Sequence, residues 1–208
     1  MNNVAKDEDS INGTWKNKRK HLSIIIMVSI IIICLGILGI IYLNMKRRTW
    51  KITQYASASG AQAMIYTIED KSNNLILIDG GYDSDADQVK SIIEEHGNHV
   101  TAWIITHPHP DHVGAFNAIM KDPGKIRVDD IYCPTVNIDK YRETAHDWDN
   151  FPVCEEFFKV KENLDNVHYV EENDEWNMLG LHVKVLHGWD ERVNHLSANL
   201  CNKGSLLF

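Results

Sequence analysis

The sequence predicts a mixed domain of the α/β (α+β) class that follows one transmembrane helix. Two observations carry this prediction. Residues 22–43 form an apolar run without a charged residue, and about 20 apolar residues span a bilayer core as a helix. From residue 50 onward, short apolar runs typical of buried strands alternate with segments of helical periodicity, which is the pattern of an α/β fold.

The chain divides into four predicted parts. Residues 1–21 are polar and lack periodicity, so we predict a disordered, basic, cytoplasmic tail. Residues 22–43 form the transmembrane helix, residues 44–51 form a short basic linker, and residues 52–208 form the folded domain.

The apolar run is predicted to be an uncleaved anchor. A secretory signal has a shorter apolar core and a small-residue cleavage site, and the end of this run offers no such site. We therefore expect a single-pass protein of the cell membrane. Basic residues flank the run on both sides, so the positive-inside rule gives nearly equal support to the two possible membrane orientations. A short N-terminal tail usually stays in the cytoplasm, which would place the folded domain outside the cell.

The first elements of the domain follow from apolar patterning and turn residues. We predict strands at 50–56, 63–68 and 75–78, the last one after a turn at 73–74. Ser84 or Asp85 can cap a helix that runs to about residue 96.

The later elements continue the alternation of strands and helices. They are a strand at 101–105, a helix at 113–121, a strand at 126–133, a partly helical region at 138–164, strands at 167–171 and 181–186, and a final hairpin over 199–207.

The motif HPHPDH at residues 107–112 follows the predicted strand at 101–105. Imidazole and carboxylate are first-choice ligands for divalent transition metals. The prolines resist helix, so we expect an extended chain in which alternate side chains face the same way. His107, His109 and Asp111 are then expected to converge on one pocket, with His112 turned toward the other side.

Together with Thr106 before it and Val113-Gly114-Ala115 after it, this motif resembles the H-x-H-x-D-H signature of the metallo-β-lactamase superfamily. Upstream, the apolar run that ends in Asp79-Gly80-Gly81 is similar to the family's strand ending in Asp before a Gly-rich turn. The resemblance covers roughly residues 51–208 and looks closest to the bacterial branch that includes the hydrolase domains of DNA-uptake competence proteins. It implies an αββα sandwich, in which two mixed sheets face each other with helices outside.

The resemblance also implies the roles of individual residues. His107 and His109 would bind a first metal ion, and Asp111 and His112 a second, which makes Asp111 the predicted catalytic residue. Asp79 would orient these ligands from behind. The first metal needs a third protein ligand. His187, at the end of a predicted strand, is our prediction for it.

His195 is the alternative third ligand, because Asn194-His195-Leu196-Ser197 resembles a segment of the competence-like branch. The cofactor implied by the resemblance is Zn²⁺, as one or two ions, with Mn²⁺ or Fe²⁺ as alternatives. A metal-bound hydroxide would attack an ester, phosphodiester or amide bond. The substrate would be a small molecule or a phosphodiester.

Charge bears on the partners of the domain. Residues 52–208 contain 12 Lys or Arg and 26 Asp or Glu, for a net charge of −14. Such a domain repels polyanions at long range, which disfavours a nucleic-acid partner without excluding it. The four cysteines form no CxxC pair, and no disulfide framework is predicted. The sequence does not indicate an oligomeric state.

The family pattern continues with a Gly-Asp, whose Asp bridges the two metals, and with a later His. The chain ends at Phe208 before these positions. We therefore expect a sandwich incomplete at the C-terminus, as a fragment or a shortened chain, with some apolar sheet surface uncovered. The second hypothesis is accordingly a truncated or degenerate, non-catalytic metal-binding or interaction protein.

Overall fold

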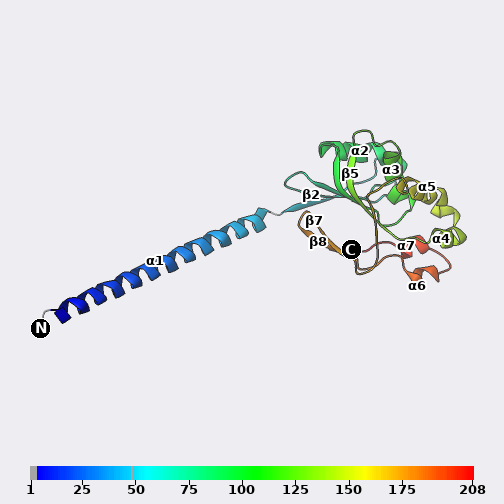
Figure 1. Cartoon of the computed structure of the whole chain (residues 1–208). Helices are drawn as coiled ribbons and strands as arrows, with labels where there is room; N and C mark the ends of the chain where they lie inside the picture. The colour runs from blue at the N-terminus through cyan, green and yellow to red at the C-terminus, as the bar shows by residue number, and fades with distance from the viewer. Residues whose placement is uncertain (1–3, 48) are drawn as a thin grey trace. The chain divides into compact units, whose positions relative to one another are not determined.

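The computed structural model describes residues 4–47 and 49–208. The chain forms two compact units, Met1–Arg48 and Thr49–Phe208. The first unit contains the helix α1 (Val4–Arg47), and the second contains every strand of the described chain (Figure 1).

Helix α1 extends past the predicted span at both ends. Residues 4–21 of the predicted tail and residues 44–47 of the predicted linker are helical. The flanks contain Lys, Arg and Glu, whose helix propensity is close to that of Leu, and lengthening an existing helix costs far less than nucleating one. Residues 1–3 and Arg48 lie outside the described residues.

The segment Arg19–Leu43 of α1 is long and apolar enough to cross a membrane, with a mean hydropathy of 3.3. None of this segment is buried against other parts of the protein. An apolar helix of this kind near the N-terminus is typical of a membrane span or of a signal sequence.

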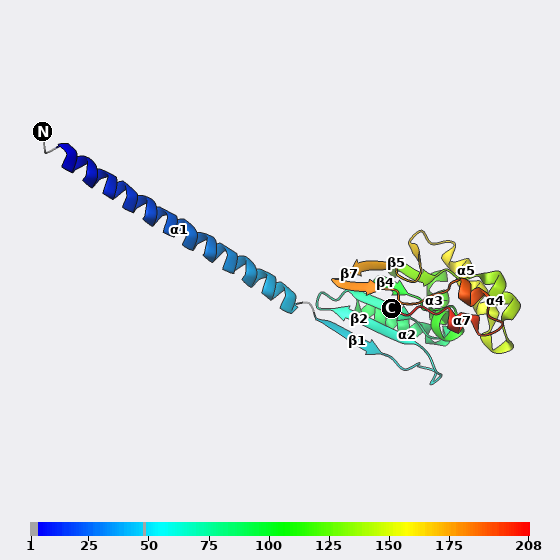
Figure 2. The same cartoon turned by 90° about the horizontal axis from the view of Figure 1, so that it is seen from below.

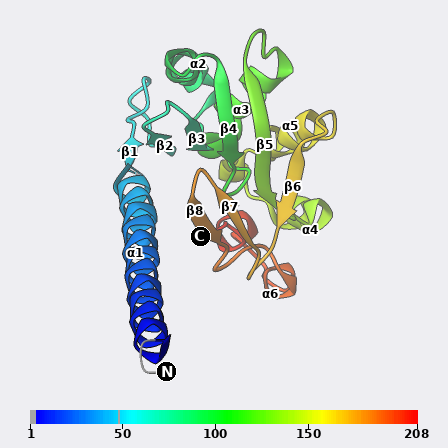
Figure 3. The same cartoon turned by 60° about the vertical axis from the view of Figure 1, so that its left-hand side comes forward.

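The second unit is built on a six-stranded mixed sheet. Its strands are β1 (Trp50–Gln54), β2 (Ile65–Asp70), β3 (Leu75–Asp79), β4 (His99–Ile104), β5 (Arg127–Pro134) and β6 (Val167–Val170). They lie side by side in chain order (Figure 3). The first three strands pair antiparallel, and β3 to β6 pair parallel.

Parallel neighbours need a crossover, and helices supply it here. The helical segments of the second unit are η1 (Asp83–Asp85), α2 (Ala86–Glu95), α3 (Pro110–Lys121), α4 (Ile138–Thr144), η2 (Asp147–Asp149), α5 (Phe151–Lys161), α6 (Glu191–Asn194) and α7 (Leu200–Lys203). Helix α2 links β3 to β4, and α3 links β4 to β5.

One face of the sheet packs against α2, α3 and α5 (Figure 1). Alternate residues of β4 show the division, since Trp103 joins this core while Ala102 and Ile104 face the other way. The opposite face carries the hairpin of β7 (Glu175–Met178) and β8 (Leu181–Lys184) (Figures 1 and 2). The predicted mixed α/β class is therefore confirmed.

Later elements of the chain also differ from the predictions. Strand β7 was not predicted, and the hairpin expected over 199–207 is instead helix α7 followed by a short extended end. Helix forms there because Leu200 and Cys201 are buried against Tyr141 and Trp189, a tertiary contact that a local turn pattern cannot reveal.

Apolar side chains are exposed at both edges of the sheet. Ile52 on β1 and Tyr169 on β6, at the two edges of the sheet, are 70% and 53% exposed. Leu186 and Leu207, after the hairpin, are also exposed.

Candidate metal site

The site lies where two parallel strands end together. Strands β3 and β4 are paired through Ile78 and Ile104 near their carboxyl ends. Asp79 closes β3, and the HPHPDH motif begins three residues after β4. The carboxyl edge of parallel strands is the usual place for a site in an α/β sheet.

Asp79 makes hydrogen bonds to several residues at this edge of the sheet. Its residue is fully buried, and its backbone adopts a left-handed φ of 56°, a conformation uncommon for residues other than Gly. Thr106 donates to its carboxylate from both the backbone N and Oγ1, each at 2.8 Å, and His112 Nδ1 lies 2.8 Å from Oδ2. Trp103 Nε1 donates to its backbone carbonyl at 2.9 Å. Asp79 therefore holds β4, Thr106 and His112 together.

The motif residues form two pairs of facing donor atoms. His107 Nε2 lies 3.1 Å from His109 Nδ1, and His112 Nε2 lies 3.5 Å from Asp111 Oδ2. Two nitrogens bound tetrahedrally to one zinc ion at about 2.0–2.1 Å would be roughly 3.3 Å apart. Both pairs therefore have about the separation of two ligands on one metal ion.

The other nitrogen of each imidazole has a polar partner. His109 Nε2 lies 2.9 Å from Asp149 Oδ1, and His112 Nδ1 binds Asp79 as described. His107 Nδ1 lies 3.2 Å from Thr106 Oγ1 and 3.3 Å from Ser205 Oγ. Metal-binding histidines are usually fixed in this way by a hydrogen bond on the nitrogen away from the metal. The donor set fits a divalent metal in chemistry and orientation.

One predicted orientation was wrong. His112 does not turn away from the other histidines, because its ring lies 3.8 Å from that of His107, centroid to centroid. Helix α3 begins at Pro110 rather than at residue 113, since Pro suits the first helical position. Asp111 and His112 therefore sit on the first helical turn, where the alternation of an extended chain no longer applies.

Sequence reasoning did not find Asp149, the partner of His109. It lies 40 residues farther along the chain, on η2, and is 1% exposed. Its second oxygen accepts from His146 N at 2.7 Å. Several acidic residues surround it in sequence, and no pattern distinguishes the one that turns inward.

Burial and charge separate the protonation states of the histidines. Burial, together with the nearby His112 and His109, lowers the pKa of His107 to about 2. Burial also lowers the pKa of His109, despite its hydrogen bond with Asp149. Both rings are therefore neutral, which is the form that binds metal.

The pKa of His112 moves the other way. Burial lowers it, but the hydrogen bonds and charges of Asp111 and Asp79 outweigh burial and raise it to about 9. Burial raises the pKa of Asp111, but its hydrogen bond with His112 and that ring's charge produce a net lowering. Without metal, a proton on His112 thus supplies the positive charge between two carboxylates, and a metal ion would replace it.

The predicted third ligand is engaged elsewhere. His187 Nε2 lies 2.7 Å from the carbonyl oxygen of Lys203, and His187 forms an isolated bridge with Leu207. His195 is exposed and lies near Glu191. Within the described chain, no group of three or more His, Cys, Asp or Glu side chains is arranged to hold a metal ion. The assignment of His187 stays a prediction.

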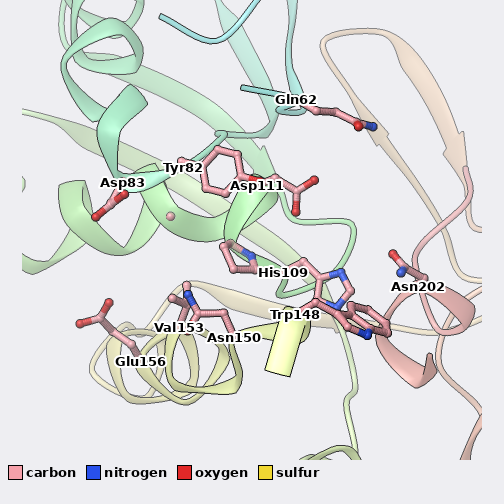
Figure 4. A pocket seen from close by; sticks show the side chains of 12 residues that line it. Gln62, Tyr82, Asp83, His109, Asp111, Trp148, Asn150, Val153, Glu156 and Asn202 are labelled. Carbon is pink, nitrogen blue, oxygen red and sulfur yellow. The ribbon is translucent and has the colours of Figure 1, made fainter. Parts of the chain in front are cut away.

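A pocket of about 550 Å³ opens beside the donor pairs (Figure 4). His109 and Asp111 contribute to its wall. The side chains farther out include Gln62, Tyr82, Asp83, Trp148, Glu156 and Asn202. A small molecule can therefore reach His109 and Asp111 from solvent.

Comparison with known proteins gives one family match. A family model described as the metallo-beta-lactamase superfamily matches residues 59–187, more than half of the chain. The matched residues include both the Asp79-Gly80-Gly81 turn and the HPHPDH motif. No curated protein matches the chain.

Three solved structures illustrate the structural likeness. A metallo-beta-lactamase from Staphylococcus aureus subsp. aureus COL is 17% identical, with 67% of this chain and 34% of that chain covered and a TM-score of 0.41. A flavo di-iron protein from Thermotoga maritima is 16% identical, with 68% and 37% covered and a TM-score of 0.42. A metallo-beta-lactamase with a HARLDQ motif from Cronobacter sakazakii is 16% identical, with 77% and 55% covered and a TM-score of 0.40. The chain thus spans about a third to just over half of these proteins.

Proposed function

The chain belongs to the metallo-beta-lactamase superfamily, and from this premise we propose that it is a membrane-anchored, metal-dependent hydrolase of ester, amide or phosphodiester bonds. The observation that carries the proposal is the arrangement of the motif. Its four donor side chains form two facing pairs, and each imidazole is held from behind by a polar partner.

His107 and His109 would hold one divalent ion, and Asp111 and His112 a second, with zinc as the proposed metal. Mn²⁺ and Fe²⁺ are the alternatives. A bound ion supplies Lewis acidity, which activates water at neutral pH and polarises a carbonyl or phosphoryl group. His187 remains our proposal for a third ligand, which requires its ring to leave the carbonyl oxygen of Lys203.

The residues around the ligands keep them in place. Asp149 accepts the Nε2 proton of His109, so Nδ1 of that ring faces His107 with a free lone pair. Asp79 accepts the Nδ1 proton of His112 and leaves Nε2 directed toward Asp111. Each buried carboxylate therefore sets both the tautomer and the direction of one ring.

Helix α1 is the proposed membrane anchor. Its segment Arg19–Leu43 has the length and hydropathy of a single span. We place the tail on the cytoplasmic side and the folded unit outside the cell. Digestion of the folded unit by a protease added to intact cells tests this orientation, and complete protection would contradict it.

Bound metal is the test of the hydrolase proposal. We expect the full chain, purified in detergent, to hold one or two zinc ions and to hydrolyse p-nitrophenyl acetate or bis-p-nitrophenyl phosphate. His107→Ala and Asp111→Ala should lose both metal and activity, while His99→Ala, a partly exposed histidine paired with Asp129, should retain both. A purified chain that contains no more metal than the buffer would contradict the proposal.

A non-catalytic metal-binding protein is the second candidate. The engagement of His187 with Lys203, and the lack of a three-residue cluster in the described part of the chain, favour it. Stoichiometric zinc without hydrolysis of either ester would support this candidate over the enzyme.

A further inference from the structure

The charged side chains that line the pocket beside the donor pairs are acidic. Asp83, Asp111 and Glu156 line it, and no Lys or Arg lines it among the residues that the structure describes. Lys121 is paired with Glu156, which balances the charge of that carboxylate. A negatively charged group placed in this pocket away from the metal ligands would therefore meet the carboxylate of Asp83, which forms no ion pair with another residue that the structure describes.

Trp148 supplies a flat apolar surface in the same pocket. It is 61% exposed, although large aromatic side chains are usually covered. Its ring is stacked on that of His146, with centroids 5.3 Å apart and planes at 17°. The ring centroid lies 6.3 Å from that of His109. Figure 4 shows both side chains in the lining of the pocket. An exposed indole next to a donor histidine can hold an apolar or aromatic group of a ligand.

This surface is fixed relative to the donor atoms. Trp148 and Asp149 are consecutive residues of η2, and Asp149 is hydrogen-bonded both to His109 and to the backbone of His146. The turn that orients His109 therefore also sets the position of the indole. A flat group resting on Trp148 would lie at a defined distance from any bond held near His109 and Asp111.

From these observations we propose that the substrate is an uncharged ester or amide that lays a flat, apolar group against Trp148. This inference rests on the proposed function for the reaction, while the selectivity belongs to the pocket itself. A bound metal would balance charge on the reacting group alone. Substrates with further negative charges, such as nucleic-acid strands, would place those charges near Asp83.

Two matched ligands test the charge preference by binding alone. Acetanilide is uncharged, and 4-acetamidobenzoate is the same molecule with a carboxylate. We expect ligand-observed NMR to show that the full chain in detergent, with zinc or with chelator, binds acetanilide at least about tenfold more tightly. Equal or tighter binding of the benzoate, or no binding of either compound, would overturn the inference.

Charge reversal assigns the preference to the pocket. Asp83→Lys places a cation on the pocket wall and should reduce the acetanilide preference by about threefold or more. Asp87→Lys changes the net charge equally at an exposed position of α2, outside the pocket lining, and should leave the preference within about twofold. Equal effects of the two variants would show that only the overall charge matters and would overturn the inference.

Substitution of Trp148 tests the apolar surface. Trp148→Ala should weaken acetanilide binding by about fivefold, and Trp148→Phe, which keeps a flat ring, should stay within about twofold of the wild type. Unchanged binding in Trp148→Ala would overturn the proposal. If the binding preferences hold but no ester is hydrolysed, the pocket inference stands and the proposed function fails. Hydrolysis without these preferences overturns the inference alone.

Discussion

Asp149 shows how a single side chain can organise a site from a distant part of the chain. It is buried, it accepts the proton of His109, and it is held by the backbone of His146. Without it, the His109 ring would have no fixed tautomer and no fixed direction. A residue in such a position behind a metal ligand typically changes metal affinity when it is replaced.

We expect Asp149→Ala to weaken zinc binding by about 10-fold to 100-fold, because His109 loses its orienting partner. The matched control is Asp147→Ala, which removes an exposed carboxylate from the same short helix, η2. Competition with a chromophoric chelator measures both affinities. Equal zinc affinity in the two variants would contradict the role given to Asp149.

His112 links the stability of the metal-free protein to pH. Its pKa is raised to about 9 in the folded chain from 6.5 in the unfolded chain. A raised pKa means that the folded state holds the proton more tightly, so the stabilisation is complete below pH 6.5 and is lost as the pH rises to about 9. For His107, the lowered pKa has the opposite effect and destabilises the fold as the pH falls from 6.5 toward 2.

Accordingly, the free energy of unfolding of the metal-free chain should fall between pH 6.5 and 9, on the order of 3 kcal/mol from His112. Urea titrations in the presence of chelator, followed by tryptophan fluorescence, measure this change. The control is His112→Gln, which cannot titrate and should show a smaller decline over the same range. The same decline in both proteins would rule out His112 as its source.

At the scale of elements, the site depends on the close approach of α3 to the turn after β3. Gly114 lies in α3, and a Cβ atom there would be 2.3 Å from the backbone N of Asp83. The backbone N of Ala115 donates to the carbonyl oxygen of Gly81 at 3.2 Å. The backbone N of Met64 donates to the carbonyl oxygen of Asp111 at 3.1 Å. These contacts bring the first turn of α3, with Asp111 and His112, against the strand that ends in Asp79.

Gly114→Ala should therefore destabilise the fold by about 1–3 kcal/mol, since backbone cannot move aside as a flexible side chain can. Gly80→Ala is the matched control, because the nearest atom to its added Cβ would be 3.4 Å away, at an ordinary contact distance. Chemical denaturation compares the two variants. A Gly114→Ala protein as stable as Gly80→Ala would show that α3 can shift without cost.

For the whole molecule, two regions of different chemistry share one chain. Helix α1 carries a segment of mean hydropathy 3.3, while residues 52–208 carry a net charge of −14. Their separation into two compact units is consistent with these differences. A strongly acidic unit of this kind repels polyanions, which agrees with the proposal of an uncharged substrate.

If α1 is a membrane anchor, two charges at its centre should release the chain from the membrane. Ile31→Asp with Leu35→Asp costs roughly 2.5–3.5 kcal/mol per residue at mid-bilayer, so the double variant should move toward the soluble fraction after carbonate extraction. The control, Ile52→Asp with Leu186→Asp, alters two exposed apolar residues of the other unit and should leave the protein in the membrane. Release of the control as well would show that α1 is not what retains the chain.

The sequence by itself determined the features that are encoded locally. The uncharged apolar run predicts a long apolar helix, the strand–helix alternation predicts the mixed α/β class, and HPHPDH predicts clustered metal-binding donors. Each of these is a pattern among near neighbours in the chain. Backbone geometry and side-chain chemistry therefore suffice to interpret it.

Only the tertiary structure decided which distant residues meet. Three contacts depend on packing between separate elements: the hydrogen bond of His109 with Asp149, the close approach of the His112 ring to that of His107, and the burial of Leu200 and Cys201 in a helix. Burial keeps His107 neutral, whereas the hydrogen bonds and charges of Asp111 and Asp79 keep the proton on His112 despite burial. Such contacts arise from the folding of the whole unit, because their energy comes from groups that the chain brings together only when the sheet and helices have assembled.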